Sequence, residues 1–373
     1  SVPTDAINRG NERLLRYLEA STGERIIAGE TLIFFDEIQS CERALTSLKY
    51  FCEETPEFHI AAAGSLLGVA INRQHYSFPV GKVETITMYP LDFEEYLWAR
   101  GKEFLASEIR SAFETMTALP DALHTEATEL YREYLLIGGM PASINAFLRS
   151  GSFLDVSLVQ NEILDNYIAD MAKYATNTDS VKIRACYNSI PAQLAKDNRK
   201  FQYKVVQKGG SASLFGASIE WLYLAGVVLK CQRISQAFEP ISVYADLSAF
   251  KLYMGDVGLL TAKSGLSQQT VLSGEGNTFM GAVTENYVAQ QLAANGHDLY
   301  YWESNNTAEL DFVLQRGNQV MAIEVKKGEH VRSRSLNLFI GTYHPSCAIR
   351  LSLKNFGEKD GLKSVPLYAA FCI

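Results

Sequence analysis

The chain has 373 residues, which is enough for two or three domains. Hydrophobic residues make up 47% and charged residues 20%, an ordinary globular composition that excludes a disordered or low-complexity chain. The formal net charge of -8 argues against non-specific coating of nucleic acid, but a local basic patch remains open.

The N-terminal part reads as α/β. The apolar run at 31–35 is typical of a strand buried on both faces, 58–64 reads as a second buried strand and 83–89 as a third. Helical stretches lie between the first two, which favours a parallel sheet. A further helix is predicted to begin after Asp92 as its N-cap, with Glu95 closing a capping box.

The rest of the chain divides into three parts. Residues 101–180 are mostly helical and are predicted to form a lid or linker. Residues 181–250 contain short helices that run into a strand-like stretch, an order that resembles a winged helix. Residues 251–373 alternate strands and helices. The predicted fold is therefore a multidomain α/β chain, with a partial parallel sheet of the P-loop NTPase kind at 1–100.

Two acids, Asp36 and Glu37, come directly after the first predicted strand. A buried strand that ends in two carboxylates is the Walker B arrangement, in which the first acid holds Mg²⁺ through water and the second polarises the attacking water. Ser65 follows the next strand, where such folds keep a polar sensor. The alternatives are a helix N-cap pair for the acids and a plain Gly-Ser turn for the serine.

No phosphate-binding loop accompanies these acids. A P-loop requires G-x-x-x-x-G-K-[ST], and the Gly-Lys pairs of this chain, 81–82 and 101–102, are not followed by Ser or Thr. The P-loop of such folds precedes Walker B, and the chain starts at Ser1 without a methionine. We therefore expect the first strand and the phosphate loop to be missing from these residues.

The stretch AELDFVLQRGNQVMAIEVKKG predicts a hairpin with its turn at 317–318. Counting outward from the turn places Asp311 opposite Glu324 and Glu309 opposite Lys326. Like charges directly opposite on a sheet are destabilising unless the face is solvated or a cation lies between them. The alternation predicts one apolar face on each arm, formed by Leu310, Phe312 and Leu314 and by Met321, Ile323 and Val325.

These hairpin residues suggest metal chemistry. Asp311 and Glu324 could jointly hold a hard cation through oxygen, with Lys326 activating a water for attack on a phosphodiester. Glu285, on a predicted helix upstream, could supply a further catalytic carboxylate. The alternative is solvated surface, because E-x-K is common on exposed strands.

A basic run between these parts could contact the phosphates of nucleic acid, because its charges alternate with aromatic residues. A solvated loop used for protein packing is an equal alternative. The candidate residues are Arg199, Lys200, Lys204 and Lys208.

Taken together, the chain resembles the bacterial and archaeal AAA-superfamily ATPases that carry a C-terminal restriction-endonuclease-like PD-(D/E)XK domain. The resemblance implies a Walker B role for Asp36 and Glu37, a sensor role for Ser65, and ATP and Mg²⁺ as cofactors. It also implies a nuclease-like core formed by Glu285, Asp311, Glu324 and Lys326. Lys82 stands where many relatives show a Gly-Arg after the sensor strand, and Arg73 is the alternative residue for an arginine-finger role. The segments that carry the resemblance are TLIFFDEIQ, AAAGSLLG, FPVGKVETITMYPLDFEEYL, YLLIGGMPASI, TENYVAQQL, AELDFVL and IEVKKG.

The complete protein is therefore expected to couple ATP hydrolysis to action on nucleic acid, with DNA as the expected substrate. The rivals are a non-catalytic nucleic-acid-binding protein or scaffold, and an ATPase switch whose C-terminal part recruits a partner. Homo-oligomers are compatible with the ATPase class. A cytoplasmic location is expected, because the six cysteines form no C-x-x-C pair or disulfide framework, and a membrane partner is not, because the longest apolar stretch is too short to span a bilayer.

Overall fold

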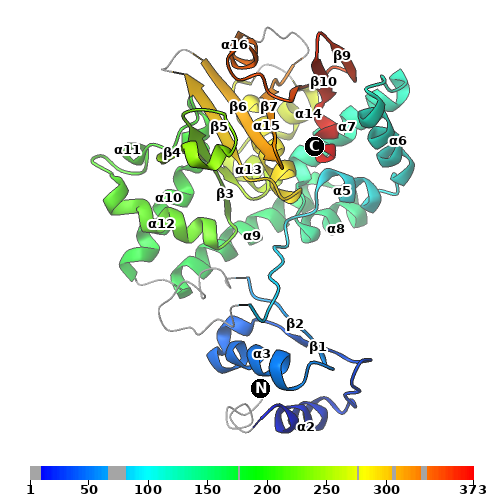
Figure 1. Cartoon of the computed structure of the whole chain (residues 1–373), viewed down its shortest axis with the longest axis vertical. Helices are drawn as coiled ribbons and strands as arrows, with labels where there is room; N and C mark the ends of the chain where they lie inside the picture. Colours follow the sequence, from blue (N-terminus) through cyan, green and yellow to red (C-terminus); the bar gives the residue numbers. More distant parts are fainter. Residues whose placement is uncertain (1–9, 66–80, 175–176, 275–276, 305–307, 329–333) are drawn as a thin grey trace. The chain divides into compact units, whose positions relative to one another are not determined.

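The computed structural model divides the chain into two compact units, residues 1–88 and 89–373, and each is described by itself (Figure 1). None of the described helices is both long and apolar enough to cross a membrane. The residues that the structure describes are 10–65, 81–174, 177–274, 277–304, 308–328 and 334–373.

The first unit is built on two parallel strands, β1 and β2, which pair from Leu32 with His59 to Phe35 with Ala62. Helices α2 and α3 cover one face of this pair, where Leu14 and Phe51 pack against Ile33. The elements are α2 (Asn11–Thr22), β1 (Leu32–Phe35), the 3-10 turn η1 (Ile38–Ser40), α3 (Glu42–Glu54) and β2 (His59–Ala62).

The other face of β1 carries apolar side chains that the described residues do not cover. Leu32 is 61% and Phe34 58% exposed, whereas Ile33 is 8% exposed. The prediction of burial on both faces is therefore wrong for this part of the chain, because α2 and α3 both pack on the Ile33 side. The predicted strand at 83–89 is also wrong: these residues form no ladder with any described strand, and Met88 is 97% exposed. An alternating β-branched pattern fits a strand but does not supply a neighbour to pair with.

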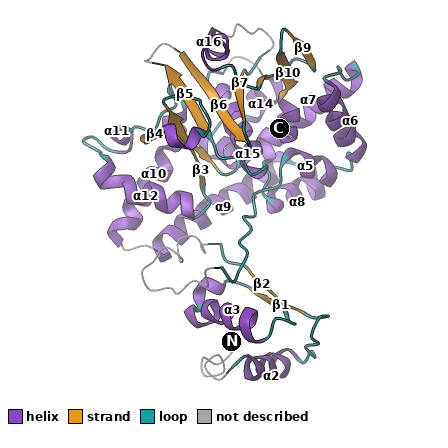
Figure 2. Cartoon of the chain, viewed as in Figure 1, coloured by secondary structure: helices purple, strands orange, loops and turns teal. Residues whose placement is uncertain are grey.

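The second unit contains an eight-stranded mixed sheet of order β4-β3-β5-β6-β7-β8-β10-β9, with helices on both faces (Figure 2). Helix α16 packs on the face that includes Trp302 and Leu310, and α15 packs on the opposite face. The strands are β3 (Val228–Ile234), β4 (Ala245–Met254), β5 (Tyr300–Ser304), β6 (Ala308–Arg316), β7 (Gln319–Val325), β8 (Cys347–Ser352), β9 (Gly357–Lys359) and β10 (Leu362–Pro366).

Most helices of the second unit precede the sheet in the chain. The helix-then-strand order expected for residues 181–250 is present, but β3 and β4 lie in the same sheet as the strands that follow. The helices are α5 (Phe93–Ala99), α6 (Glu103–Thr115), α7 (Asp121–Ile137), α8 (Pro141–Ser150), α9 (Phe153–Tyr174), α10 (Asn177–Leu194), α11 (Tyr203–Val206), α12 (Ala212–Leu224), α13 (Val257–Ser264), α14 (Gln268–Ser273), α15 (Met280–Ala294) and α16 (Arg334–Tyr343), with 3-10 turns η2 (Ile241–Tyr244) and η3 (Leu367–Cys372).

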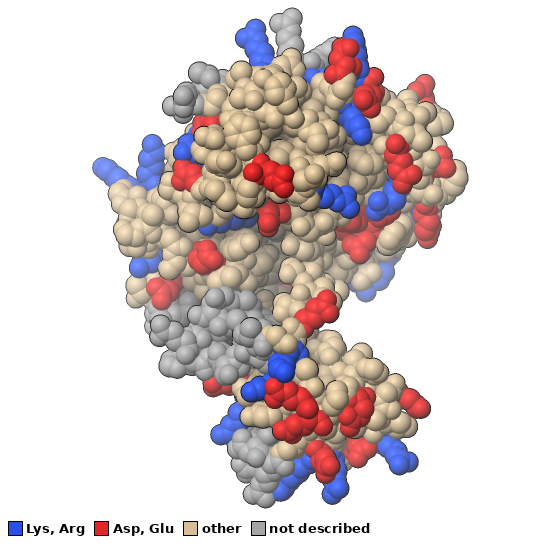
Figure 3. Space-filling model, in the orientation of Figure 1, with Lys and Arg blue, Asp and Glu red and all other residues tan. Residues whose placement is uncertain are grey.

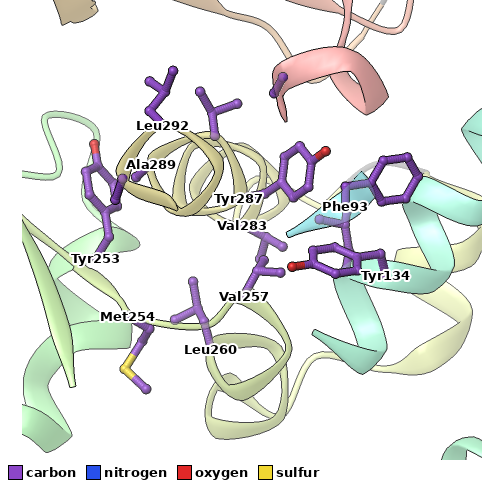
Figure 4. Close-up of a cluster of buried hydrophobic side chains, with 14 of the residues drawn as sticks. Phe93, Tyr134, Tyr253, Met254, Val257, Leu260, Val283, Tyr287, Ala289 and Leu292 are labelled. Atoms are coloured by element: carbon purple, nitrogen blue, oxygen red, sulfur yellow. The ribbon is translucent and has the colours of Figure 1, made fainter. Parts of the chain in front are cut away.

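Helix α15 is the centre of this unit, because every residue of it except Gly281 and Ala294 is buried. A helix buried all round belongs to the core of a large domain. Figure 4 shows Tyr287 of α15 beside Phe93 and Tyr134, whose ring centroids lie 6.4 and 5.8 Å from that of Tyr287.

The polar residues of α15 bind backbone groups of neighbouring segments. Asn286 accepts from Met254 N at 2.7 Å and donates to Met254 O at 3.0 Å. Gln290 accepts from the backbone N of Val257 at 2.9 Å. Gln291 does the same for Phe93 at 2.9 Å. The helix therefore holds the end of β4 and the starts of α13 and α5 together through side-chain hydrogen bonds, which buried backbone groups require.

The break between α7 and α8 is tied to Asp256, the N-cap of α13. The Asp256 carboxylate accepts from Leu259 N at 2.9 Å and from Gly139 N at 2.6 Å. A Cβ on Gly138, whose φ is 72°, would lie 2.2 Å from Asp256 Oδ1. The predicted capping box of α5 is confirmed: Asp92 accepts from Glu95 N at 2.8 Å and Glu95 accepts from Asp92 N at 2.9 Å.

Asp256 predicts a pH dependence of stability. Its burial raises its pKa from 3.8 to about 6, so the folded state holds this proton more tightly than the unfolded state. The stability contributed by protonation is complete below about pH 4 and is lost as the pH rises through 6. We expect the difference in unfolding free energy between wild type and Asp256→Asn to change by up to about 3 kcal/mol over that range. Urea unfolding at pH 4 to 7 measures it, and a constant difference would contradict the assignment.

Candidate functional site

The carboxyl ends of β1 and β2 lie at the same edge of the first sheet. Ala63 N donates to Phe35 O at 2.8 Å, and Ile38 N donates to Ala63 O at 3.0 Å, so the parallel pairing continues past both strands. Asp36 and Glu37 follow β1 directly, and Ser65 is the third residue after the end of β2. The topology therefore brings these three predicted residues to one edge.

The two acids are held in a tight local arrangement. Glu37 has φ 50° and ψ 40°, a left-handed conformation that is uncommon for a residue other than glycine. The Asp36 carboxylate accepts from Glu37 N at 3.0 Å, and the Glu37 carboxylate accepts from Gln39 Nε2 at 2.7 Å. The N-cap of α3 is Cys41, so the acids do not cap that helix. Strained backbone of this kind, costing about 1–3 kcal/mol, concentrates at functional sites.

Both acids are exposed, and neither forms an ion pair with another described residue. Carboxylates that keep their water and lack a cationic partner are suited to Mg²⁺, which retains several waters when it binds to proteins. The residues at this edge therefore fit the metal that an ATPase of this class uses. Arg73, the alternative to Lys82, lies outside the described residues, and Lys82 is ion-paired with Glu53 at 3.1 Å.

In the second unit the hairpin of β6 and β7 has the predicted register. Arg316 pairs with Gln319, and the ladder runs back to Phe312 and Ile323. The predicted apolar face of β6 is wrong, however. A bulge against β5 places two residues, Asp311 and Phe312, opposite one. Leu310 therefore packs in the core on the α16 side, while Phe312 and Leu314 pack on the α15 side.

The hairpin carboxylates have partners from the chain itself. Asp311 Oδ2 accepts from Val325 N at 2.8 Å. Glu324, which is 2% exposed, lies 3.1 Å from Lys326 Nζ and 3.7 Å from Arg350 Nε. The β6–β7 ladder ends at the Phe312–Ile323 pair, and the Val325 N–Asp311 hydrogen bond keeps Asp311 beside the strand that carries Glu324.

Glu285 belongs to a different cluster, which we call the Lys251 cluster: Lys251, Glu285, Glu309, Tyr253 and Arg199. Lys251 is completely buried, and its Nζ lies 2.9 Å from Glu285 Oε1 and 2.6 Å from Glu309 Oε1. Tyr253 donates a hydrogen bond to Glu285, and Arg199 forms an ion pair with it. Glu309 therefore pairs with Lys251, whereas the sequence placed it opposite Lys326. Lys326 pairs with Glu324 instead.

The basic run is divided between the interior and the surface. Arg199 pairs with Glu285 of α15 and Lys200 pairs with Glu303 of β5, so both are engaged with acids of the second unit. Lys204 and Lys208 are exposed. On the face shown in Figure 3, basic and acidic side chains are interspersed over the second unit and do not gather into one basic surface. Of the four candidate residues, Lys204 and Lys208 are therefore the ones placed to contact a phosphate.

Lys251 is the residue that sequence reasoning missed. It is a single cation in the apolar run AFKLYM, and its ammonium also lies 5.0 Å from the ring centroid of Tyr301. A lone lysine in a buried strand needs a carboxylate partner, so this pattern could have indicated a pair with Glu285.

Among the residues that the structure describes, in either unit, no group of three or more His, Cys, Asp and Glu side chains is arranged to hold a metal ion. At the hairpin, Glu324 is paired with Lys326 and Arg350, whereas Asp311 accepts from Val325 N and pairs with no described cation. A divalent ion there would have to displace the cations of Glu324.

Residues 3–97 match the family model described as an AAA domain, which supports an ATPase-like protein. The matched residues fall within the 1–100 that were expected to form an ATPase core, and those bounds stay a prediction. Residues 128–270 and 280–370 match families described as domains of unknown function, DUF8612 and DUF4143.

Particular relatives cover little of the chain. Uncharacterized proteins of Mycobacterium tuberculosis and Mycobacterium bovis are each 35% identical over 79 residues, which is 21% of this chain and 18% of their own length. The Walker-type ATPase PABY2304 of Pyrococcus abyssi is 15% identical with a TM-score of 0.39, covering 68% of this chain and 66% of its own. Protein VC1899 of Vibrio cholerae is 12% identical with a TM-score of 0.20, covering 100% and 79%. Neither TM-score establishes a shared fold.

The Lys251 cluster predicts a large loss of stability on removal of its central cation. Lys251→Met keeps the length of the side chain but leaves Glu285 and Glu309 without the ammonium, so we expect a loss of about 3–5 kcal/mol in unfolding free energy. The double variant Lys251→Met/Glu285→Gln should recover part of this loss, because it removes one of the stranded charges.

Urea unfolding measures both variants. The matched control is Lys230→Met on the neighbouring strand β3, whose ammonium contacts the Phe250 ring at 5.0 Å and forms no ion pair with a described residue. We expect that change to cost less than about 1 kcal/mol. An equal loss of unfolding free energy in Lys251→Met and Lys230→Met would show that the Lys251 ammonium does not compensate the buried carboxylates.

Proposed function

We propose that the protein is an AAA-type ATPase whose hydrolytic carboxylates are Asp36 and Glu37. One observation carries this proposal: an exposed acid pair and Ser65 follow neighbouring parallel strands at the same edge of a sheet, within the segment that matches the AAA domain. That edge is where open α/β sheets bind their ligands.

The roles follow from position and chemistry. Asp36 would hold Mg²⁺ through water, and the metal would neutralise charge on the phosphates of ATP. Glu37 would orient the attacking water and accept its proton, and its constrained backbone would fix the direction of the carboxylate. Ser65 would donate to the terminal phosphate. The 373 residues contain no G-x-x-x-x-G-K-[ST], so the proposal assigns no phosphate cradle to them.

ATP hydrolysis by the full-length protein tests these roles. Glu37→Gln should lower kcat by about 100-fold or more, because a positioned general base contributes roughly 10²–10⁴ in rate. Asp36→Asn should raise the Mg²⁺ concentration needed for half-maximal rate. The matched control is Glu30→Gln. Glu30 is exposed and precedes β1, and the four residues of that strand, about 13 Å long, separate it from the acids.

The control should keep the wild-type rate. Retention of hydrolysis in Glu37→Gln, or an equal loss in Glu30→Gln, would remove the acid pair from the mechanism.

For the second unit we propose a non-catalytic role in binding nucleic acid or a protein partner, in place of phosphodiester cleavage. The support is the charge balance of its acids. Glu285 and Glu324 are buried and paired with cations of the chain, and a buried carboxylate that already has such a partner gains little from a metal. The rival is a Mg²⁺-dependent nuclease in which Glu324 and Glu285 release these cations, Asp311 joins them, and Lys326 assists the attack.

Cleavage assays separate the two roles. We expect a supercoiled plasmid to stay intact with wild type and with Lys326→Ala in either Mg²⁺ or Mn²⁺, under conditions in which a control nuclease digests it. Mn²⁺ titrations of wild type and Asp311→Asn, followed by calorimetry, should superimpose. Cleavage by wild type that is lost in Lys326→Ala, or Mn²⁺ binding lost in Asp311→Asn, would establish the nuclease instead.

A further inference from the structure

A cavity lies in the second unit, at the edge of the sheet formed by β3 and β4. Its volume is about 450 Å³, within the range of about 300–1,000 Å³ that small ligands occupy. Three tyrosines and two acids line it: Tyr89, Tyr223, Tyr300, Glu220 and Asp298. Leu229 and Leu299 add apolar surface. None of these residues belongs to the hairpin or to the Lys251 cluster.

The three tyrosines and Asp298 line the same cavity. Burial raises the pKa of the Tyr89, Tyr223 and Tyr300 hydroxyls, and the Asp298 carboxylate raises each of them further. The Tyr300 side chain is 9% exposed, and its hydroxyl forms no hydrogen bond with a described residue. A hydroxyl at a cavity wall without a protein partner is a place where a ligand can donate or accept.

The charges of the cavity favour a cation. Asp298 and Glu220 form no ion pair with other described residues. Lys230 also lines the cavity, with its Nζ 5.0 Å from the Phe250 ring centroid, and His297 Nε2 lies 3.2 Å from Ile373 O. The lining therefore carries two carboxylates against one ammonium, and this excess of negative charge favours an ammonium or guanidinium over a phosphate.

We propose that this cavity binds the arginine side chain of a peptide or protein partner. A guanidinium is planar, so it stacks on a tyrosine ring while its N–H groups form paired hydrogen bonds with a carboxylate. Leu229 and Leu299 suit the aliphatic part of the side chain. Of the cationic side chains, arginine is the one that can stack on the rings, bind the acids and pack its aliphatic part on the apolar wall. The proposal goes beyond the proposed ATPase function and needs no nucleotide.

Titration of the full chain with blocked arginine, N-acetyl-arginine methylamide, tests this assignment by NMR. Saturable binding is expected, with the affinity at least 5-fold weaker in Asp298→Asn and in Tyr223→Ala, while Tyr223→Phe retains it because the ring remains. The blocked citrulline analogue, which has the same shape without the charge, should not bind. Tighter binding of an arginine-containing peptide than of the single blocked residue would identify a peptide source over a free guanidinium compound.

The matched control for the acid is Asp360→Asn, in the turn between β9 and β10 at the opposite edge of the sheet. It should keep the wild-type affinity. No saturable binding of blocked arginine, equal binding of citrulline, or an unchanged affinity in Asp298→Asn would overturn the proposal, as would preferential binding of a single-stranded oligonucleotide that Asp298→Asn strengthens. Glu37→Gln should leave arginine binding unchanged, so failure here and failure of the ATPase assignment are distinguishable.

Discussion

The second unit depends on the complete burial of α15. A helix without a solvent face cannot leave its polar side chains in water, so each of them must find a partner in the core. The side-chain oxygens of Asn286, Gln290 and Gln291 accept from the backbone N of Met254, Val257 and Phe93, which come from two distant parts of the chain, the β4–α13 junction and the start of α5. The same constraint explains why the stretch TENYVAQQL carries several polar residues although it is buried.

Glu285 is the extreme case of this constraint, because it is charged. An isolated carboxylate in the interior is very costly, and its cost falls only with a cation and further hydrogen bonds around it. Lys251 and Arg199 supply the cations, and Tyr253 donates a hydrogen bond. Glu309 is a second carboxylate that binds the Lys251 ammonium. A carboxylate at a nuclease-like position is therefore compatible with a structural role, and the residue type alone does not distinguish the two.

Local features were predictable from the sequence, and contacts across the sheet were not. The turn at 317–318, the register beyond it and the capping box of Asp92 depend on residues close in the chain, and all three are present. The bulge at Asp311 depends on β5, and the pairing of Glu285 depends on β4, so neither leaves a mark in local spacing. The acid pair after β1 was found because parallel strands bring their carboxyl ends together.

Environment, more than residue type, separates the two groups of acids. Asp36 and Glu285 are both carboxylates next to a sheet, yet Asp36 is exposed after β1 and Glu285, on α15, is fully buried beside an ammonium. A divalent ion must displace whatever already compensates a carboxylate. Asp36 pairs with no described cation, so a hydrated Mg²⁺ has no ion pair to displace there, whereas at Glu285 it would have to displace the buried lysine. Chemistry is therefore favoured in the first unit, and the acids of the second unit serve to hold its parts together around α15.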